Sequence, residues 1–274
     1  MQAHKNANRW SGFADTYDAV RPACPGVVVD VLQRYLGRVP KTVVDLGCGT
    51  GLSTLVWKGK ARRVIGVDPS DDMRALAAAR TAGCPGFEYV RAFSDCVPLP
   101  DGVADVVTCS QSFHWMEPVY TLAEVNRLLA PGGVFAAFDC DWPPVCSARV
   151  EMAYDVLLGK VKEIEGSEDA YKDAFIRYPK DRHLANIRAS GHFSYAREVV
   201  FMNAEPCDAA RYMGIAVSQG GVQAVLKREP ERIQGELERF RSIVEEEFRT
   251  GRPESGTAGE KEILFCYRMR VGVK

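Results

Sequence analysis

The chain has 274 residues, of which 46% are hydrophobic and 26% charged. These fractions are ordinary for a globular protein and exclude the disordered and fibrous classes. The formal net charge of -1 provides no basic field that would gather nucleic acid or an anionic membrane, so neither is predicted as a partner.

The first half of the chain alternates short β-branched runs with helical patterns, which is typical of repeated strand–helix–strand units and a parallel sheet. Two helices are predicted before the first strand, at residues 10–17 and 27–35. Strands are then expected at residues 41–46, 63–67, 87–90, 103–109 and 134–138. Between them, a helix is predicted to open at Leu52, a second to cover residues 69–81 and a third to cover residues 122–129.

The second half of the chain has a different sequence pattern. Its pattern is helical and mixed from about residue 147 to 190, with strands expected at residues 195–202 and 262–271. Helices are predicted at residues 208–216 and near 233–248, where apolar residues recur at spacings of three and four.

These elements predict one α/β unit, a doubly wound, mainly parallel seven-stranded Rossmann-like sheet with helical cap inserts. Residues 1–40 are expected to form N-terminal lid helices, and residues 41–140 the ligand-binding core. Residues 141–274 are expected to supply the helical cap and the last two strands of the same sheet. The sequence does not predict an oligomeric state.

The nine cysteines are odd in number and mostly lie in apolar stretches, which predicts reduced side chains packed in the core. The nearest approach to a metal-ligand spacing is Cys140 with Cys146, and no metal site is predicted from it. No apolar signal core opens the sequence, and no run of about 18 apolar residues occurs in it. We therefore expect a cytoplasmic protein.

A glycine-rich turn at residues 47–51 lies between a buried strand and a helix, where open α/β sheets bind ligands. Dinucleotide sites favour the spacing G-x-G-x-x-G, whereas this turn reads G-x-G-x-G. Asp45 precedes the turn, and its carboxylate would repel a pyrophosphate but suit a ligand that carries an ammonium group and a sulfonium. This favours S-adenosylmethionine as the cofactor. Asp68, at the end of the second strand, is placed to accept the ribose hydroxyls of either kind of nucleotide.

Three segments in this order resemble the motifs of class I methyltransferases that share the type 11 methyltransferase domain. They are residues 45–51, residues 64–73 and residues 94–102, and the resemblance covers roughly residues 9–140. It implies that S-adenosylmethionine is bound by Tyr17, Arg21, Asp45, Gly47, Cys48, Gly49, Gly51, Asp68, Pro69, Met73, Phe93, Ser94, Asp95 and Ser110.

Family members often carry an aspartate for the adenine amino group where this chain has Phe93, so Ser94 or Asp95 is expected to supply that contact. The segment with Tyr17 and Arg21 resembles one that many relatives fold over the methionine moiety. Arg21 would pair with the cofactor carboxylate, unless it is an ordinary surface arginine near a helix end.

After the fourth strand, Gln111, His114 and Trp115 resemble the Gln-x-x-His-Trp signature of a subset that includes trans-aconitate methyltransferases. We predict these three residues at the reaction face. Methyl transfer is an in-line displacement at carbon, so alignment and exclusion of water supply much of the acceleration. His114 would act as a general base if the acceptor carries a proton; alternatively, it packs beneath the cofactor.

The acceptor is expected to be a small molecule chosen by residues of the cap inserts. The candidates are Trp142, Tyr154, Arg177, Tyr178, Arg182, Arg211, Tyr212 and Gln219. Residues 211–213, followed by Ser218 and Gln219, lie where related enzymes place substrate-facing groups, and this resemblance favours an anionic acceptor such as a carboxylic acid. The alternative is a run of charged residues on a solvated helix face. The predicted reaction is methylation of a carboxylic acid or hydroxyl oxygen. The alternatives are a methyltransferase-like binding protein without activity and, less favoured by the glycine spacing, a nicotinamide-dependent oxidoreductase.

Overall fold

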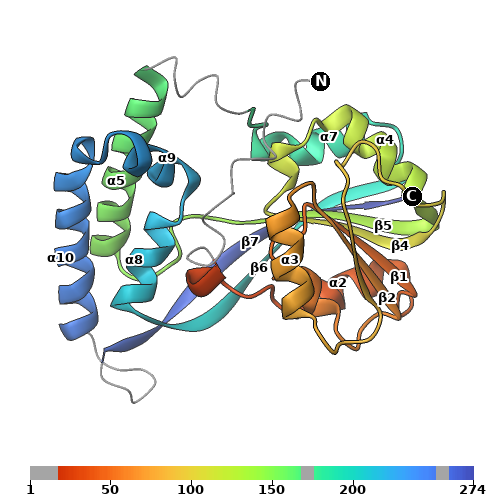
Figure 1. Ribbon diagram of the computed structural model, residues 1–274, viewed down its shortest axis with the longest axis horizontal. Helices are drawn as coiled ribbons and strands as arrows, with labels where there is room; N and C mark the ends of the chain where they lie inside the picture. Colours follow the sequence, from red (N-terminus) through yellow and green to blue (C-terminus); the bar gives the residue numbers. More distant parts are fainter. Residues whose placement is uncertain (1–17, 168–175, 251–258) are drawn as a thin grey trace.

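A computed structural model describes residues 18–167, 176–250 and 259–274 of the chain (Figure 1). Its centre is a seven-stranded sheet with the strand order β3-β2-β1-β4-β5-β7-β6. The strands are β1 (Thr42–Leu46), β2 (Arg63–Val67), β3 (Phe87–Val90), β4 (Ala104–Ser110), β5 (Leu129–Cys140), β6 (Tyr195–Asp208) and β7 (Glu260–Val273). The first five pair in parallel, and β7 runs antiparallel to both of its neighbours. The predicted Rossmann-like sheet is confirmed.

Helices cover both faces of the sheet because the central strands present apolar side chains on both faces. Val43 and Val64 pack with α2 (Val27–Leu36) on one face. On the other face, Val44 and Ile65 belong to a cluster that also includes apolar residues of α4 (Pro118–Leu128) and α7 (His183–Ala189). The helix α3 (Asp71–Arg80) follows β2, with Ser70 as its N-cap, and packs against β2 and β3.

The helix predicted to open at Leu52 is not formed as an α-helix. The segment is a single 3-10 turn, η2 (Thr54–Trp57). The hydroxyls of Ser53 and Thr54 both donate to Asp45 Oδ2 at 2.8 Å, which ties this segment to β1. Shortly afterwards Gly59 has φ 69°, a left-handed conformation that does not continue a helix. The predicted helix at residues 10–17 lies outside the described residues.

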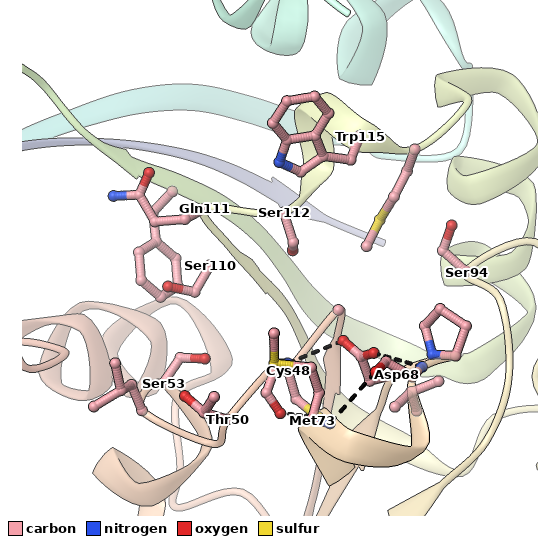
Figure 2. A pocket seen from close by; sticks show the side chains of 18 of the residues that line it. Cys48, Thr50, Ser53, Asp68, Met73, Ser94, Ser110, Gln111, Ser112 and Trp115 are labelled. Atoms are coloured by element: carbon pink, nitrogen blue, oxygen red, sulfur yellow. Dashed lines mark hydrogen bonds between the residues drawn. The ribbon is translucent and has the colours of Figure 1, made fainter. Parts of the chain in front are cut away.

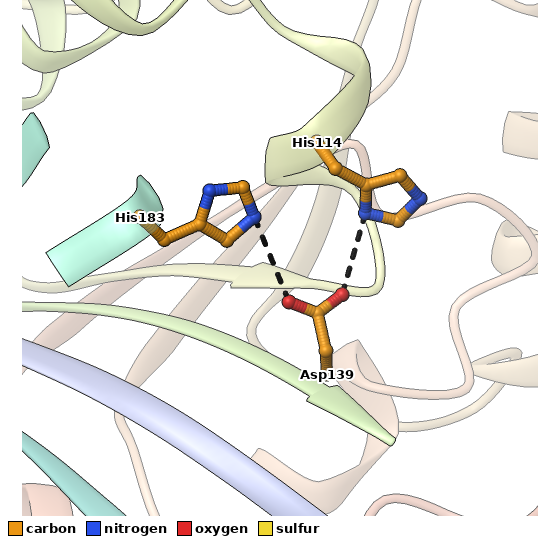
Figure 3. A group of neighbouring side chains, drawn as sticks. All are labelled: His114, Asp139 and His183. Atoms are coloured by element: carbon orange, nitrogen blue, oxygen red, sulfur yellow. Dashed lines mark ion pairs between the residues drawn. The ribbon is translucent and has the colours of Figure 1, made fainter. Parts of the chain in front are cut away.

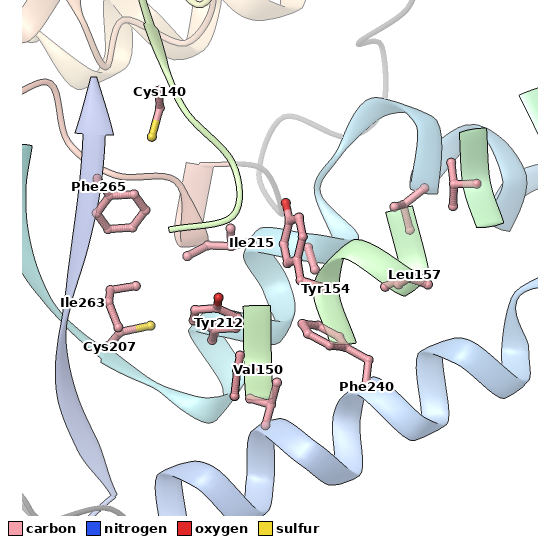
Figure 4. Packing of buried hydrophobic residues seen from close by; sticks show 14 of the residues in the cluster. Cys140, Val150, Tyr154, Leu157, Cys207, Tyr212, Ile215, Phe240, Ile263 and Phe265 are labelled. Atoms are coloured by element: carbon pink, nitrogen blue, oxygen red, sulfur yellow. The ribbon is translucent and has the colours of Figure 1, made fainter. Parts of the chain in front are cut away.

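The last two strands are longer than expected and form an antiparallel pair that reaches beyond the parallel strands (Figure 1). β5 pairs with β7 as far as Cys140 opposite Tyr267, whereas β6 and β7 stay paired to Asp208 opposite Glu260. Four helices pack against this extension: α5 (Ala148–Ser167), α8 (Ala209–Val217), α9 (Gly220–Arg228) and α10 (Gln234–Thr250). They form the helical cap, which has a hydrophobic core of its own (Figure 4).

Candidate functional site

One pocket brings together most of the site residues predicted from the sequence (Figure 2). It lies where β1, β2 and β4 end, at the carboxyl edge at which open α/β sheets bind ligands. The predicted residues that line it are Arg21, Gly47, Cys48, Gly49, Asp68, Pro69, Met73, Phe93, Ser94, Asp95, Ser110, Gln111 and Trp115. Asp45, Gly51 and His114 do not line this pocket, and Tyr17 lies outside the described residues.

The glycine turn leaves room that side chains would otherwise fill. Gly47 has φ 66°, and a Cβ atom on it would lie 2.7 Å from the Cβ of Ser112 and 2.8 Å from the Cε of Met116. Gly49 has φ 53° and no heavy atom within 4 Å of its Cβ position. The backbone of the turn is therefore exposed to the pocket, where a ligand can approach it closely.

Asp68 presents its carboxylate to the pocket from the end of β2. Its two oxygens accept hydrogen bonds from the backbone N–H groups of Gly49 at 3.1 Å and Ser70 at 2.9 Å, which fix the side chain. Burial raises the pKa of Asp68 above its ordinary value, and these two hydrogen bonds oppose that shift. Each carboxylate oxygen keeps further acceptor capacity, as recognition of a ribose diol requires.

Asp45 has a different place from the one predicted. Its side chain is 1% exposed, and it accepts hydrogen bonds from the hydroxyls of Ser53, Thr54 and Thr108, each at 2.8 Å. The carboxylate therefore lies beneath the turn and joins β1 to β4 and to η2. Burial raises the pKa of Asp45, and the three hydroxyls oppose that shift. Its observed role is to hold the shape of the turn.

The wall near the start of α3 is largely apolar. Pro69 and Met73 line it together with Phe93, while Ser94 and Asp95 add polar atoms. The Ser94 hydroxyl lies 2.9 Å from that of Thr121. This mixture suits a flat aromatic ring with hydrogen-bonding edges. The adenine contacts of Phe93, Ser94 and Asp95 remain predictions.

Arg21 lies at the side of the pocket nearest the cap. Its guanidinium is 4.8 Å from the centre of the Trp142 ring and donates a hydrogen bond to the Ser218 carbonyl at 2.9 Å. It therefore connects the N-terminal segment with the cap across the pocket. The predicted pairing of Arg21 with a cofactor carboxylate remains a prediction.

The residue that follows β4 has an unusual backbone. Gln111 has φ 53°, the only positive φ of a non-glycine residue in the described part of the chain. Its N–H donates to the Phe138 carbonyl at 2.9 Å, which holds this conformation. Strained backbone of this kind is concentrated at functional sites, and Gln111 lines the pocket.

His114 lies behind the pocket wall, in a buried cluster with Asp139 and His183 (Figure 3). Its Nδ1 is 3.3 Å from Asp139 Oδ1, and His183 Nε2 is 3.7 Å from Asp139 Oδ2. Lys180 Nζ lies 2.8 Å from Oδ1, and an Arg270 guanidinium nitrogen lies 3.4 Å from Oδ2. Of the two interpretations of His114, this placement favours packing over direct contact with a reacting acceptor.

Burial keeps both histidines neutral. It lowers the pKa of His114 and the pKa of His183 to about 4 each, with Asp139 acting in the opposite direction in both cases. The pKa of Asp139 stays below its ordinary value, because the nearby His114 and the charge of Lys180 outweigh the effect of burial.

These shifts predict a loss of stability in mild acid. A histidine whose pKa is lower in the folded state binds protons more readily in the unfolded chain, so stability falls as the pH drops from about 6.5 towards 4. At pH 5 the expected loss is about 2 kcal/mol for each of the two histidines relative to pH 7.5. Protonation of Asp139 does not contribute to the loss at pH 5, because the pKa of Asp139 lies below its ordinary value and the group is protonated only at lower pH. Urea unfolding at both pH values measures the loss, and His183→Phe should remove about half of it.

Several pocket residues were not predicted from the sequence. Cys24 and Tyr267 come from opposite ends of the chain, Ser112 and Met116 from the segment that follows β4, and Phe138 from β5. Position after a strand end was a usable signal for Ser112, whereas no local signal marks Tyr267, which the β5–β7 pairing brings in.

Three of the candidate acceptor residues have structural places, whereas two lie at or near the pocket. Trp142 lines the pocket, and the Arg177 guanidinium is 5.6 Å from the centre of the Trp115 ring. In contrast, Tyr154 and Tyr212 are buried in the core of the cap (Figure 4). Arg211 forms an ion pair with Glu205 and donates to backbone carbonyls, so it stabilises the turn into α8.

Comparison with known proteins shows the family to which the chain belongs. The methyltransferase domain family matches the chain over residues 44–137. An uncharacterised methyltransferase of Mycobacterium tuberculosis is 34% identical over 117 residues, 43% of this chain and 46% of that protein. The demethylmenaquinone methyltransferase of Thermus thermophilus is 30% identical over 178 residues, 60% of this chain and 80% of that enzyme. The chain belongs to the class I S-adenosylmethionine-dependent methyltransferases.

The solved structures agree with this assignment at the level of the fold. A putative type II methyltransferase of Anaeromyxobacter dehalogenans superimposes with a TM-score of 0.65 at 20% identity, covering 92% of this chain and 97% of that one. The chain spans about half the length of several curated relatives that it matches, the M. tuberculosis protein among them. Among the helices of the described residues, none combines the length and apolar character needed to cross a bilayer.

The residues of this pocket fit S-adenosylmethionine, the cofactor of the family. The open space beside Gly49 and the fixed carboxylate of Asp68 suit a ribose close to the backbone. The wall at Met73 suits an adenine ring, and Arg21 lies at the side nearest the cap. When bound, the cofactor supplies an electrophilic methyl group on a sulfonium.

Proposed function

We propose that this methyltransferase transfers the methyl group of S-adenosylmethionine to a carboxylic acid or hydroxyl oxygen of a small molecule. The observation that supports it most directly is the continuity of one pocket, from the Asp68 carboxylate to a second region bounded by Gln111, Trp115 and Trp142. The first region suits the nucleoside of the cofactor. The second region has space for an acceptor next to the sulfonium. Apolar walls in the second region would exclude water from the displacement.

The chain's own residues align the reactants in this proposal. Gly47 and Gly49 let the backbone approach the cofactor, Asp68 orients the ribose, and Arg21 closes the side near the cap. Among the residues that the structure describes, the pocket lining includes no histidine. Alignment of this kind contributes much of the rate in an in-line displacement that requires no proton transfer.

Binding of S-adenosylhomocysteine tests the cofactor part of the proposal. At 100 times its dissociation constant, a ligand specific for the folded state stabilises it by about 2.7 kcal/mol. For a chain of this size that corresponds to a rise of roughly 5 to 10 °C in Tm. NADH at the same concentration is the matched control and should leave Tm unchanged. A rise with NADH and none with S-adenosylhomocysteine would show that the cofactor assignment is wrong.

The transfer step requires a separate measurement. Radiolabelled S-adenosylmethionine should label a subset of small carboxylic acids and phenols, with one S-adenosylhomocysteine formed per methyl group transferred. If S-adenosylhomocysteine binds but no small molecule is labelled, the chain is a binding protein with a methyltransferase fold.

A further inference from the structure

The amide group of Gln111 has a defined orientation in the pocket wall. Lys180 Nζ lies 3.4 Å from Gln111 Oε1 and donates a hydrogen bond to it. An ammonium group has donors and no acceptor, so the amide oxygen must be the atom that faces it. The two N–H donors of Gln111 Nε2 are therefore on the other side of the amide. Because Gln111 lines the pocket, these donors are available to an occupant.

Lys180 is itself held by contacts outside the pocket. Its ammonium is 2.8 Å from Oδ1 of Asp139, whose side chain is 3% exposed near the end of β5. The segment before Lys180 is docked on η3 (Phe113–Trp115), since the Tyr178 N–H donates to the His114 carbonyl at 2.8 Å. These contacts thus connect the buried cluster to the pocket wall, from Asp139 to Lys180 and from Lys180 to Gln111.

A metal ion is a weaker explanation of the same cluster. The ligand atoms of His114, Asp139 and His183 lie within 4.8 Å of one another, which is compatible with a cation site in principle. However, Lys180 and Arg270 already contact the two oxygens of Asp139. These two positive side chains already neutralise the carboxylate and would repel a divalent cation. The observed contacts instead favour a role for Asp139 in holding Lys180.

We propose that Asp139 and Lys180 are positioning residues that make Gln111 a hydrogen-bond donor to a carboxylate acceptor. The inference rests on the proposed methyltransferase function and narrows its substrate class from carboxylic acids and alcohols to carboxylates. The positive charge of Lys180 directly behind the amide favours an anionic oxygen. Arg177, against Trp115, adds a second positive charge on the same side of the pocket.

A carboxylate acceptor also fits the chemistry of the pocket. One carboxylate oxygen forms a bond to the methyl carbon while the carbon–sulfur bond breaks, and the electron pair of that bond goes to sulfur. The products are a neutral methyl ester and S-adenosylhomocysteine, and no proton is released. A hydroxyl acceptor would need a base, whereas the buried His114 does not line the pocket.

The test compares each carboxylic acid of a panel with its primary alcohol as acceptors of a radiolabelled methyl group. The panel contains mono-, di- and tricarboxylic acids of two to eight carbons, a range chosen as roughly the size of a small-ligand pocket. The wild type should methylate carboxylates and leave the alcohols unlabelled. Lys180→Met should raise KM for the carboxylate about ten-fold or more and change kcat much less, because a charge-assisted contact is lost. Lys180→Arg should recover most of the affinity.

Two further variants separate this role from a structural one. Gln111→Glu keeps the side-chain shape but turns a donor into a carboxylate, so it should reduce kcat/KM for carboxylates by more than Lys180→Met does. Lys162→Met, an exposed lysine on α5, is the matched control and should match the wild type. S-adenosylhomocysteine affinity should stay within about two-fold of the wild type in all four variants.

The outcomes distinguish this inference from the proposed function. If alcohols are methylated as well as carboxylates, or if Gln111→Glu and Lys180→Met leave KM for carboxylates unchanged, the inference is wrong and the methyltransferase function stands. If S-adenosylhomocysteine binds but no acid in the panel is methylated, the carboxylate assignment is wrong. If the wild type does not bind S-adenosylhomocysteine, the proposed function itself fails.

Discussion

Asp68→Ala is expected to weaken the binding of S-adenosylhomocysteine by about 100-fold or more. In the proposed function the carboxylate accepts both ribose hydroxyls, and hydrogen bonds to a charged group contribute about 1.5 to 3 kcal/mol each. Two such bonds correspond to a loss of at least about 3 kcal/mol, or roughly two orders of magnitude in Kd. Isothermal titration of wild type and variant measures this difference directly.

The controls for Asp68→Ala address the two backbone amides that also depend on this carboxylate. Gly49 and Ser70 each lose an acceptor in the variant, so its unfolding in urea should be measured beside the titration. Asp68→Asn keeps the shape and one acceptor oxygen, and should lose less affinity. Asp72→Ala removes an exposed carboxylate from the first turn of α3 and should bind normally. Unchanged affinity in a folded Asp68→Ala variant would mean that Asp68 does not contact the ribose.

Gly47→Ala is expected to abolish measurable S-adenosylhomocysteine binding and to lower stability by about 2 to 4 kcal/mol. An alanine at φ 66° costs about 1 kcal/mol or more in backbone strain. The added Cβ would also lie 2.7 Å from Ser112, whose hydroxyl is fixed by its hydrogen bond to the Leu46 carbonyl. Overpacking of this kind adds about 1 to 3 kcal/mol. The turn must shift to relieve it, and the shift would move its amides away from the ligand.

Gly59→Ala is the matched control for Gly47→Ala. Gly59 has φ 69°, nearly the same backbone conformation, but no heavy atom lies within 4 Å of its Cβ position and it does not line the pocket. It should therefore show the cost of strain alone, about 1 to 2 kcal/mol, with normal ligand binding. Equal effects of the two substitutions would contradict the importance of the contact with Ser112. Urea unfolding and titration with S-adenosylhomocysteine measure both quantities.

The core of the fold was predictable because its signals are local. The β-branched runs at residues 41–46 and 63–67 form buried parallel strands, and the glycines between strand and helix take positive φ as the turn requires. Asp68 ends its strand at the pocket, as its position in the sequence predicts. In each case the pattern over a few neighbouring residues contains the information.

Asp45 shows where local information ends. Its position beside the turn suggested contact with the ligand, but Thr108, distant in sequence, donates to the same carboxylate as Ser53 and Thr54. A buried carboxylate needs several donors, and no local pattern reveals that a hydroxyl on the neighbouring strand supplies one. The motif was recognised correctly while the orientation of one of its side chains was not.

What the sequence by itself determined about this protein is the parallel sheet, the glycine turn and the aspartate at the end of β2. These follow from backbone geometry and from the alternation of apolar residues, which act over short distances. Only the tertiary structure decided that His114 lies behind the pocket wall, that Lys180 contacts Gln111 and that Tyr267 lines the pocket. Those contacts join residues from separate strands and helices, so they depend on how the elements pack and on which charges burial brings together.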